Sequence, residues 1–153
     1  MANTYTQLYI QLVFAVKGRE NLIPHMHKEE LHKYITGIVQ SRGNKMLAIN
    51  AMPDHIHIFL GLNPTNSISD LVRDIKSNSS SFITQQKFTA HKFNWQEGYG
   101  AFSYAHSQVD AVVQYVLNQE QHHKKQTFKE EYLLFLSKFN ITYDEQYLFE
   151  WIE

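Results

Sequence analysis

Two histidines separated by one residue stand in the segment MPDHIHIFLG. Its alternating apolar residues are typical of a β-strand, in which successive side chains point to opposite faces. His55 and His57 therefore share one face, which we expect to be the solvated working face. The opposite face carries Ile56, Ile58 and Leu60 and should pack under helices. Two imidazoles at this spacing on a rigid strand could bind one divalent cation. The alternative is a surface or hydrogen-bonded pair, because a chain with nine histidines can contain H-x-H by chance.

A tyrosine that could act as a nucleophile lies in the segment QVDAVVQYVLNQEQHHKK, residues 108–125, whose periodicity predicts one helix. Tyr115 and Gln119 are one turn apart beside its valine-rich stripe, so the helix can pack while presenting both. A phenol becomes nucleophilic when a base or a metal promotes loss of its proton. The Gln119 carbonyl could bind a metal, and His122 on the same face is an alternative ligand. Alternatively, Tyr115 is a tyrosine at the core edge with a solvated hydroxyl.

The elements that must position these residues follow the order β-α-β-β-α-β, with further helices after them. The order predicts an α+β protein of the ferredoxin-like (RRM-like) type, an antiparallel sheet with two helices on one face. Ser67 with Asp70, Ser107 with Asp110, and Thr127 with Glu130 predict capped helix starts. The expected strands are 5–16, two strands within 45–62, and 93–105; the expected helices are 27–43, 68–86, 108–125, 128–139 and a short one near 144–151.

Length and composition indicate one globular domain spanning residues 1–153, with a core of about 5–125 and a helical extension of about 126–153. The chain has no cysteine, which favours a cytoplasmic location. No apolar run is long enough for a membrane span, and the N-terminal segment lacks the basic start and cleavage site of a leader. The formal net charge of −1 argues against a general electrostatic grip on nucleic acid, although a local one is compatible with it.

The conjunction of PDHIHI with the later YVLNQ resembles the HUH motif and Y-x-x-x-Q helix of the IS200/IS605-type single-tyrosine transposases. DLVRDIKSNSSSFI and WQEGYGAFSYA are also similar to that family, so the resemblance spans roughly residues 5–125. The family's enzymes cut and rejoin single-stranded DNA. The resemblance implies that His55, His57 and Gln119 bind Mg²⁺ or Mn²⁺. It also implies that Tyr115 forms a 5′-phosphotyrosine intermediate.

The resemblance further implies a homodimer in which the tyrosine helix of one subunit completes the site of the other. The implied partner is single-stranded DNA at element ends, folded as hairpins. Trp95 and Phe102 are better explained as core than as base-stacking residues. The expected DNA contacts are Lys17, Arg19, Arg73, Lys76 and Tyr99.

Two other functions are compatible with the sequence. A domesticated relative of the REP-associated tyrosine transposases would keep the same chemistry and could act as a monomer. A noncatalytic RRM-like module would bind single strands through aromatic residues of its sheet and would need no tyrosine beside the histidines.

Overall fold

The computed structural model describes residues 3–152 and contains one antiparallel four-stranded sheet. Its strands are β1 (Tyr9–Ala15), β2 (Lys45–Ala51), β3 (His55–Gly61) and β4 (Gly100–Tyr104), in the spatial order β2-β3-β1-β4. Each neighbouring pair is antiparallel, and β1 lies between β3 and β4. This arrangement confirms the predicted ferredoxin-like α+β fold. Within residues 3–152, each helix is too short or too polar to cross a membrane.

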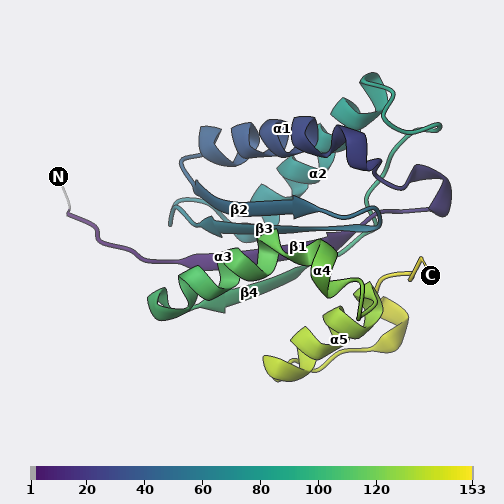
Figure 1. The fold of residues 1–153 in the computed structure, drawn as a ribbon. Coiled ribbons are helices and arrows are strands. Elements are labelled where there is room, and N and C mark those ends of the chain that lie inside the picture. Colours follow the sequence, from purple (N-terminus) through teal and green to yellow (C-terminus); the bar gives the residue numbers. More distant parts are fainter. Residues whose placement is uncertain (1–2, 153) are drawn as a thin grey trace.

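Two helices cover one face of the sheet: α1 (Lys28–Ser41) and α2 (Ile68–Gln85), which pack side by side (Figure 1). The residues predicted for this face, Ile56, Ile58 and Leu60, are buried in the main core. Helix α2 begins as expected, because the Ser67 side chain accepts a hydrogen bond from the Asp70 N–H. The serine-rich segment continues the helix to Gln85.

The opposite face of the sheet carries α3 (Val109–Leu117) and, beyond it, α4 (Gln119–His122) and α5 (Phe128–Lys138), as Figure 1 shows. The prediction of one helix over 108–125 was wrong. The backbone departs from helical geometry at Asn118, with φ −97° and ψ 22°. The predicted Ser107 cap was also wrong, because a 3₁₀ turn precedes α3 and the Gln108 side chain accepts from the Ala105 N–H.

The C-terminal extension packs onto the core through aromatic residues. Helix α5 begins with the predicted capping box, in which Thr127 and Glu130 exchange side-chain and backbone hydrogen bonds. The segment expected to form a last helix contains only a 3₁₀ turn, Glu145–Tyr147. After it, Phe149 packs on Phe128 and Tyr132 of α5, with ring centroids 6.0 and 5.0 Å apart. The extension is thus an ordered layer beside the sheet.

The strand expected over 93–105 is shorter than predicted, since continuous pairing covers only Gly100–Tyr104. Upstream of it, Trp95 forms an isolated bridge with Val16. Trp95 and Phe102 are buried, with 7% and 2% of their surface exposed, which confirms the core interpretation. The Trp95 indole N–H donates to Ser79 Oγ at 2.9 Å, and this bond fixes the segment against α2.

His32 on α1 links helix and sheet, and it predicts an acid-sensitive contribution to stability. Its Nε2 accepts a hydrogen bond from the Ala51 N–H at 2.9 Å. Burial, followed by repulsion from Lys28 and opposed by Glu29, lowers the pKa of His32 from 6.5 to about 4. The unfolded chain therefore takes up this proton near pH 6.5 and the folded chain only near pH 4. We expect this group to cost at most about 3 kcal/mol of unfolding free energy as the pH falls through that interval.

Urea unfolding of wild type and His32→Gln between pH 7 and pH 4 measures this contribution. Glutamine can accept the same N–H but does not titrate, so its unfolding free energy should fall less steeply with decreasing pH. Equal slopes for both proteins would contradict the assignment.

Candidate active site

The H-x-H pair lies on β3 and faces the layer formed by α3, α4 and α5. Both side chains are fully buried, which corrects the expectation of a solvated working face. The reason is α5, which covers this end of the sheet: the Phe128 ring stacks on His55 at 4.0 Å between centroids. The two imidazole centroids are 5.2 Å apart. A surface-exposed pair is thereby excluded.

His55 is oriented by its neighbour in the turn. Its Nδ1 lies 2.7 Å from Asp54 Oδ1, so a proton on Nδ1 leaves the Nε2 lone pair free. Within residues 3–152, Nε2 is buried and makes no hydrogen bond. Burial is the largest influence on this ring and lowers the pKa of His55, which keeps the imidazole neutral. A carboxylate holding Nδ1 while Nε2 stays free is the usual preparation of a histidine for metal binding.

His57 is held by Gln11 on the neighbouring strand β1, and Gln11 is held in turn by Tyr104 on β4. The Gln11 side-chain nitrogen lies 2.9 Å from His57 Nδ1, and the Tyr104 hydroxyl donates to Gln11 Oε1 at 2.8 Å. Binding a metal through Nε2 requires the proton of His57 on Nδ1. A half-turn of the Gln11 amide would present its oxygen to that proton, and the Tyr104 hydroxyl could then accept from the amide nitrogen.

A carboxylate from α5 enters the centre, and sequence reasoning missed it. Glu131 is 2% exposed, and its Oε1 lies 3.0 Å from His57 Nε2, 3.2 Å from His123 Nε2 and 3.7 Å from His55 Nε2. One ligand atom from each of these four residues lies within 4.8 Å of the others. The centre therefore combines three imidazoles with one carboxylate.

The charges within this cluster favour an ionised carboxylate. Burial acts to raise the pKa of Glu131, but attraction to His57 and the hydrogen bonds with His123 and His57 together hold it well below its usual range. Glu131 in turn changes the pKa of His123. Burial acts to lower the pKa of His123, whereas its bond with Glu131 raises it above the ordinary value. Glu131 is thus a buried anion compensated by its histidine neighbours.

Tyr115 lies in the same cluster. Its hydroxyl donates a hydrogen bond to Glu131 Oε2, and its ring meets that of His57 edge to face at 5.9 Å. Burial, and then the negative charge of Glu131, raises the pKa of Tyr115 above its ordinary value. The phenol is therefore neutral in this arrangement. Of the alternatives left open by the sequence, the solvated core-edge tyrosine is wrong, because this hydroxyl points at the histidine–carboxylate cluster.

Gln119 lies at the border of the cluster. It is buried, with its amide nitrogen donating to the Tyr115 carbonyl at 3.3 Å and its Oε1 3.0 Å from His123 Nε2. The structure therefore places Gln119 beside His123. Gln119 is linked to the His55–His57 pair through His123. His122, the alternative ligand, lies outside the group of His55, His57, His123 and Glu131. The break at Asn118 changes the phase of the following turn, so His122 packs against the Tyr115 ring at 4.6 Å and His123 faces Glu131.

The chemistry of this donor set fits a divalent cation. It offers imidazole nitrogens, one of which is a buried atom without a hydrogen bond in the described chain, together with a carboxylate oxygen. Imidazole and carboxylate together suit first-row metals such as Mn²⁺, and a carboxylate with open positions also suits Mg²⁺. The residues that could hold an ion are His55, His57, His123 and Glu131.

Three of the residues expected to contact DNA lie on the α2 side of the sheet, opposite the layer that contains this cluster. Arg73, Lys76 and Tyr99 line one open cavity of about 420 Å³ between α2 and the loop before β4. The Lys76 ammonium donates to the carbonyls of Gln96 and Gly98 at 2.8 and 2.6 Å, and burial lowers its pKa to about 8. Arg73 pairs with Asp70 at 3.0 Å on the surface of α2. Lys17 and Arg19 follow the end of β1 and are exposed.

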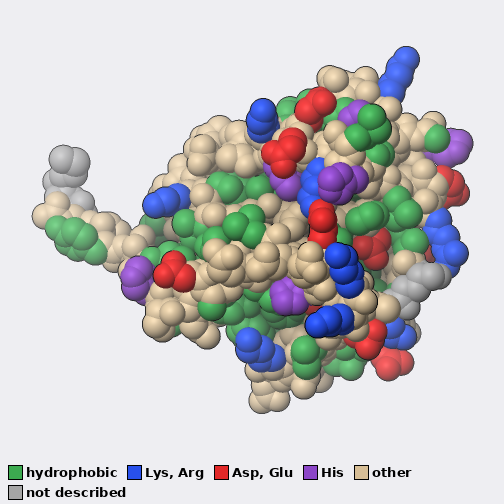
Figure 2. Space-filling view, in the orientation of Figure 1, with side chains coloured by type: hydrophobic (Ala, Val, Ile, Leu, Met, Phe, Trp, Pro, Cys, Tyr) green, Lys and Arg blue, Asp and Glu red, His purple; other side chains and the backbone are tan. Residues whose placement is uncertain are grey.

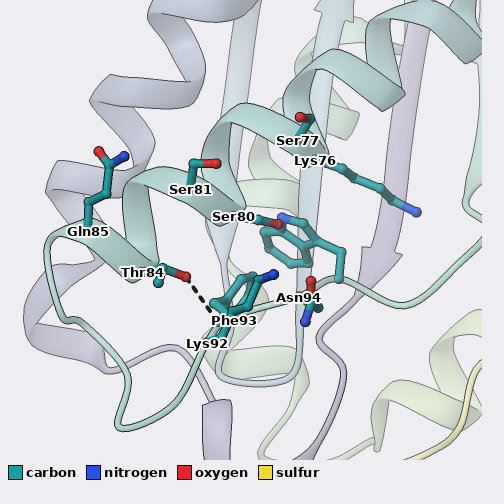
Figure 3. Close-up of a pocket in the computed structure, with 10 residues that line it drawn as sticks. Lys76, Ser77, Ser80, Ser81, Thr84, Gln85, Lys92, Phe93 and Asn94 are labelled. Carbon is teal, nitrogen blue, oxygen red and sulfur yellow. Dashed lines mark hydrogen bonds between the residues drawn. The ribbon is translucent and has the colours of Figure 1, made fainter.

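A second groove runs along the distal half of α2. It has a volume of about 450 Å³ and is lined by hydroxyl side chains of α2 that face the segment 92–95. Figure 3 shows Ser77, Ser80 and Ser81 along the helix, with Thr84 bonded to the backbone N–H of Phe93 at 3.0 Å. Since α2 lies on the face of the sheet opposite α3, this groove is separate from the histidine cluster.

Comparison with known proteins agrees with the fold and the motifs. The family described as Transposase IS200 like matches residues 4–119, and the chain belongs to this family. The match includes His55, His57, Tyr115 and Gln119 and ends before His123 and Glu131.

Three individual proteins resemble the chain at sequence identities between 15% and 28%. The ISDra2 transposase TnpA of Deinococcus radiodurans is 28% identical over 74 residues, which are 48% of this chain and 53% of that protein. The chain therefore matches about half the length of this relative. A structure from D. radiodurans R1, described as a candidate transposase, has a TM-score of 0.60 and 22% identity over 78% of this chain and 95% of its own. A REP-associated tyrosine transposase bound to a REP hairpin has a TM-score of 0.60 and 15% identity, covering 80% and 73% respectively. These two structures share the fold.

Proposed function

We propose that the protein cuts and rejoins single-stranded DNA in a metal-dependent reaction, with Tyr115 as the nucleophile. The observation that carries the proposal is the convergence of the Tyr115 hydroxyl and the His57 imidazole on one carboxylate, Glu131. A nucleophile beside a buried donor set for a cation is the arrangement that phosphodiester transfer requires. Membership of the IS200-like transposase family supports the same chemistry.

The cation would be Mg²⁺ or Mn²⁺, held by His55 and His57 with Glu131 and His123. When bound, it supplies positive charge that stabilises the transferring phosphate and lowers the pKa of the nearby phenol. Gln119, which the sequence suggested as the third ligand, would hold His123 through its Oε1. Asp54 and Gln11 would orient the two β3 histidines.

The chemical step assigned to this chain is one transesterification. The Tyr115 oxygen attacks phosphorus while the bond from phosphorus to the 3′-oxygen breaks, which leaves a 5′-phosphotyrosine and a free 3′-hydroxyl. Glu131 Oε2 already faces the phenolic proton that must leave, and the departing 3′-oxygen takes a proton from water. The phosphodiester energy stays in the tyrosine ester, so a second 3′-hydroxyl can attack it and rejoin the strands without ATP.

The proposed substrate is single-stranded DNA at element ends, including hairpins. The structural neighbour described as bound to a REP hairpin supports this substrate class. Lys17, Arg19, Arg73, Lys76 and Tyr99 remain proposed DNA contacts. A homodimer with exchanged tyrosine helices and a cytoplasmic location also stay predictions. In the structure, Tyr115 meets the histidines of its own chain, so a single subunit contains every residue of the proposed site.

A domesticated, REP-associated type of enzyme is the second candidate. The presence of all proposed site residues in one chain favours this candidate, because such an enzyme could cleave as a monomer. Light scattering of the active protein separates the two: a stable monomer supports the domesticated type, and a dimer supports the transposase of a mobile element.

Incubation with single-stranded DNA tests the proposal. We would use a labelled pool of oligonucleotides with random centres and hairpin flanks, with Mg²⁺ or Mn²⁺, followed by a denaturing gel. The proposal predicts a labelled band at the mass of protein plus DNA that chelation of the metal prevents. Binding without any covalent band on any pool would instead identify a noncatalytic single-strand-binding module.

A further inference from the structure

A cavity lies between α3 and α5, directly beside the proposed nucleophile. Its volume is about 310 Å³, and Tyr115 and Glu131 form part of its wall. In the space-filling view, hydrophobic side chains gather at the surface between these helices, with lysine and histidine side chains around them (Figure 2). We call this cavity the α3–α5 pocket. Its volume is at the lower end of the range for sites that bind small organic groups.

The walls of the α3–α5 pocket are mainly apolar and partly aromatic. Tyr104 from the end of β4 and Phe135 from α5 contribute rings, and Ala111, Val112 and Leu134 contribute aliphatic surface. Leu134 is 59% exposed, so the pocket opens to solvent through an apolar edge. The Phe135 ring is fixed by stacking on Phe102 at 5.0 Å and by edge contact with Tyr115 at 5.7 Å. A flat aromatic guest would meet a rigid wall.

Polar groups stand at the margin of this apolar surface. Gln108 uses its Oε1 to accept the Ala105 N–H, and among the described residues its amide nitrogen makes no hydrogen bond. Gln126 also lines the pocket, and Lys138 lies at the exposed end of α5. Two amides can bond to the edge of a heterocycle, and one ammonium can contact a phosphate. A purely apolar guest would leave these groups unused.

We propose that the α3–α5 pocket binds an unpaired nucleobase of the DNA strand, from a nucleotide next to the phosphate that Tyr115 attacks. This inference rests on the proposed function and extends it to substrate positioning. The argument is continuity: the pocket shares Tyr115 and Glu131 with the reactive cluster, so a base held in it places its own phosphodiester near the phenol. Enzymes that act on single strands commonly hold bases by stacking on aromatic side chains.

Filling the pocket tests the proposal. Ala111 on α3 is exposed and lines the pocket, whereas Gln114 on the same helix is exposed and does not. Ala111→Trp should therefore block the pocket, and Gln114→Trp is the matched control. The probe is a dT20 oligonucleotide carrying one photoreactive 5-iodouracil, with crosslinked peptides identified by mass spectrometry. Circular dichroism would verify that both variants fold as wild type.

In wild type and in Gln114→Trp, we expect crosslinks to Tyr104, Tyr115 or Phe135. In Ala111→Trp, their yield should fall at least about tenfold, since stacking contributes roughly 1–3 kcal/mol per base. Crosslinks only at other residues, or an unchanged yield in Ala111→Trp, would overturn the proposal. Conversion of a wild-type dimer to a monomer by Ala111→Trp would also overturn it, because the pocket would then be a subunit contact.

The experiment separates this inference from the proposed cleavage activity. Crosslinks in the pocket without any covalent phosphotyrosine band would support base binding in the α3–α5 pocket and contradict the proposed cleavage activity. A phosphotyrosine band formed equally well by wild type and Ala111→Trp would keep the nuclease and reject the base site.

Discussion

Tyr115→Phe should abolish the covalent protein–DNA band, lowering its yield at least about a thousandfold, because the proposed reaction depends on the Tyr115 hydroxyl as its nucleophile. The substitution removes only the hydroxyl that donates to Glu131 and keeps the ring that packs against His57 and Phe135. DNA binding and the folded structure should therefore persist. The measurements are the denaturing gel for the adduct and a filter-binding assay for affinity.

Tyr147→Phe is the matched control, since Tyr147 is 79% exposed and lies outside the cluster. It should form the adduct as wild type does. An adduct formed by Tyr115→Phe at a similar yield would show that another residue attacks the DNA.

His57→Gln should weaken Mn²⁺ binding at least about a hundredfold and remove adduct formation with it. The side chain is fully buried, and its Nε2 meets Glu131 at 3.0 Å, so its loss deprives the donor set of a central member. Glutamine keeps a polar group beside Glu131, which limits the cost of leaving a buried carboxylate without a partner. Electron paramagnetic resonance of free Mn²⁺ gives the affinity independently of activity.

The control for this variant is His91→Gln, which changes an exposed histidine in the loop after α2. Its Mn²⁺ affinity should equal that of wild type.

Mixing His57→Gln with Tyr115→Phe tests whether the site is formed within one chain or between two subunits. The in-chain site predicts that the mixture forms no adduct, whereas recovery would show that tyrosine helices are exchanged between subunits.

Much of the scaffold follows from local sequence patterns. The alternation in PDHIHIF predicted which residues of β3 face α1 and α2, and the Ser67 and Thr127 caps predicted where α2 and α5 begin. These features depend on neighbours in sequence, which periodicity and capping describe directly. The burial of His55 and His57 was not predicted, because it depends on the docking of α5.

Glu131 could have been found from its position in the helix. Phe128, Glu131, Tyr132 and Phe135 have the spacing i, i+3, i+4, i+7, which places the carboxylate in the apolar stripe of α5. A charged residue in a buried stripe requires a partner or a function. The acidic member of this stripe is the residue that sequence reasoning missed. Its partner could not be inferred, since His57 lies 74 residues away.

His123 was missed for a different reason. The prediction continued one helical phase through Asn118, which favoured His122, but the chain leaves helical geometry there and α4 restarts in a new phase. No proline or glycine marks this break in the sequence. The residues that complete the cluster, His123 and Glu131, also lie beyond the part of the chain that matches the family, residues 4–119.

The most direct test of the central claim is to digest the covalent complex and identify the peptide that carries the nucleotide. We predict that the peptide contains Tyr115, with the nucleotide joined through a 5′-phosphate on the phenolic oxygen and a 3′-hydroxyl on the released strand. A nucleotide on any other residue, or a 3′-phosphate linkage, would contradict the assignment of Tyr115 as the nucleophile of a 5′-phosphotyrosine intermediate.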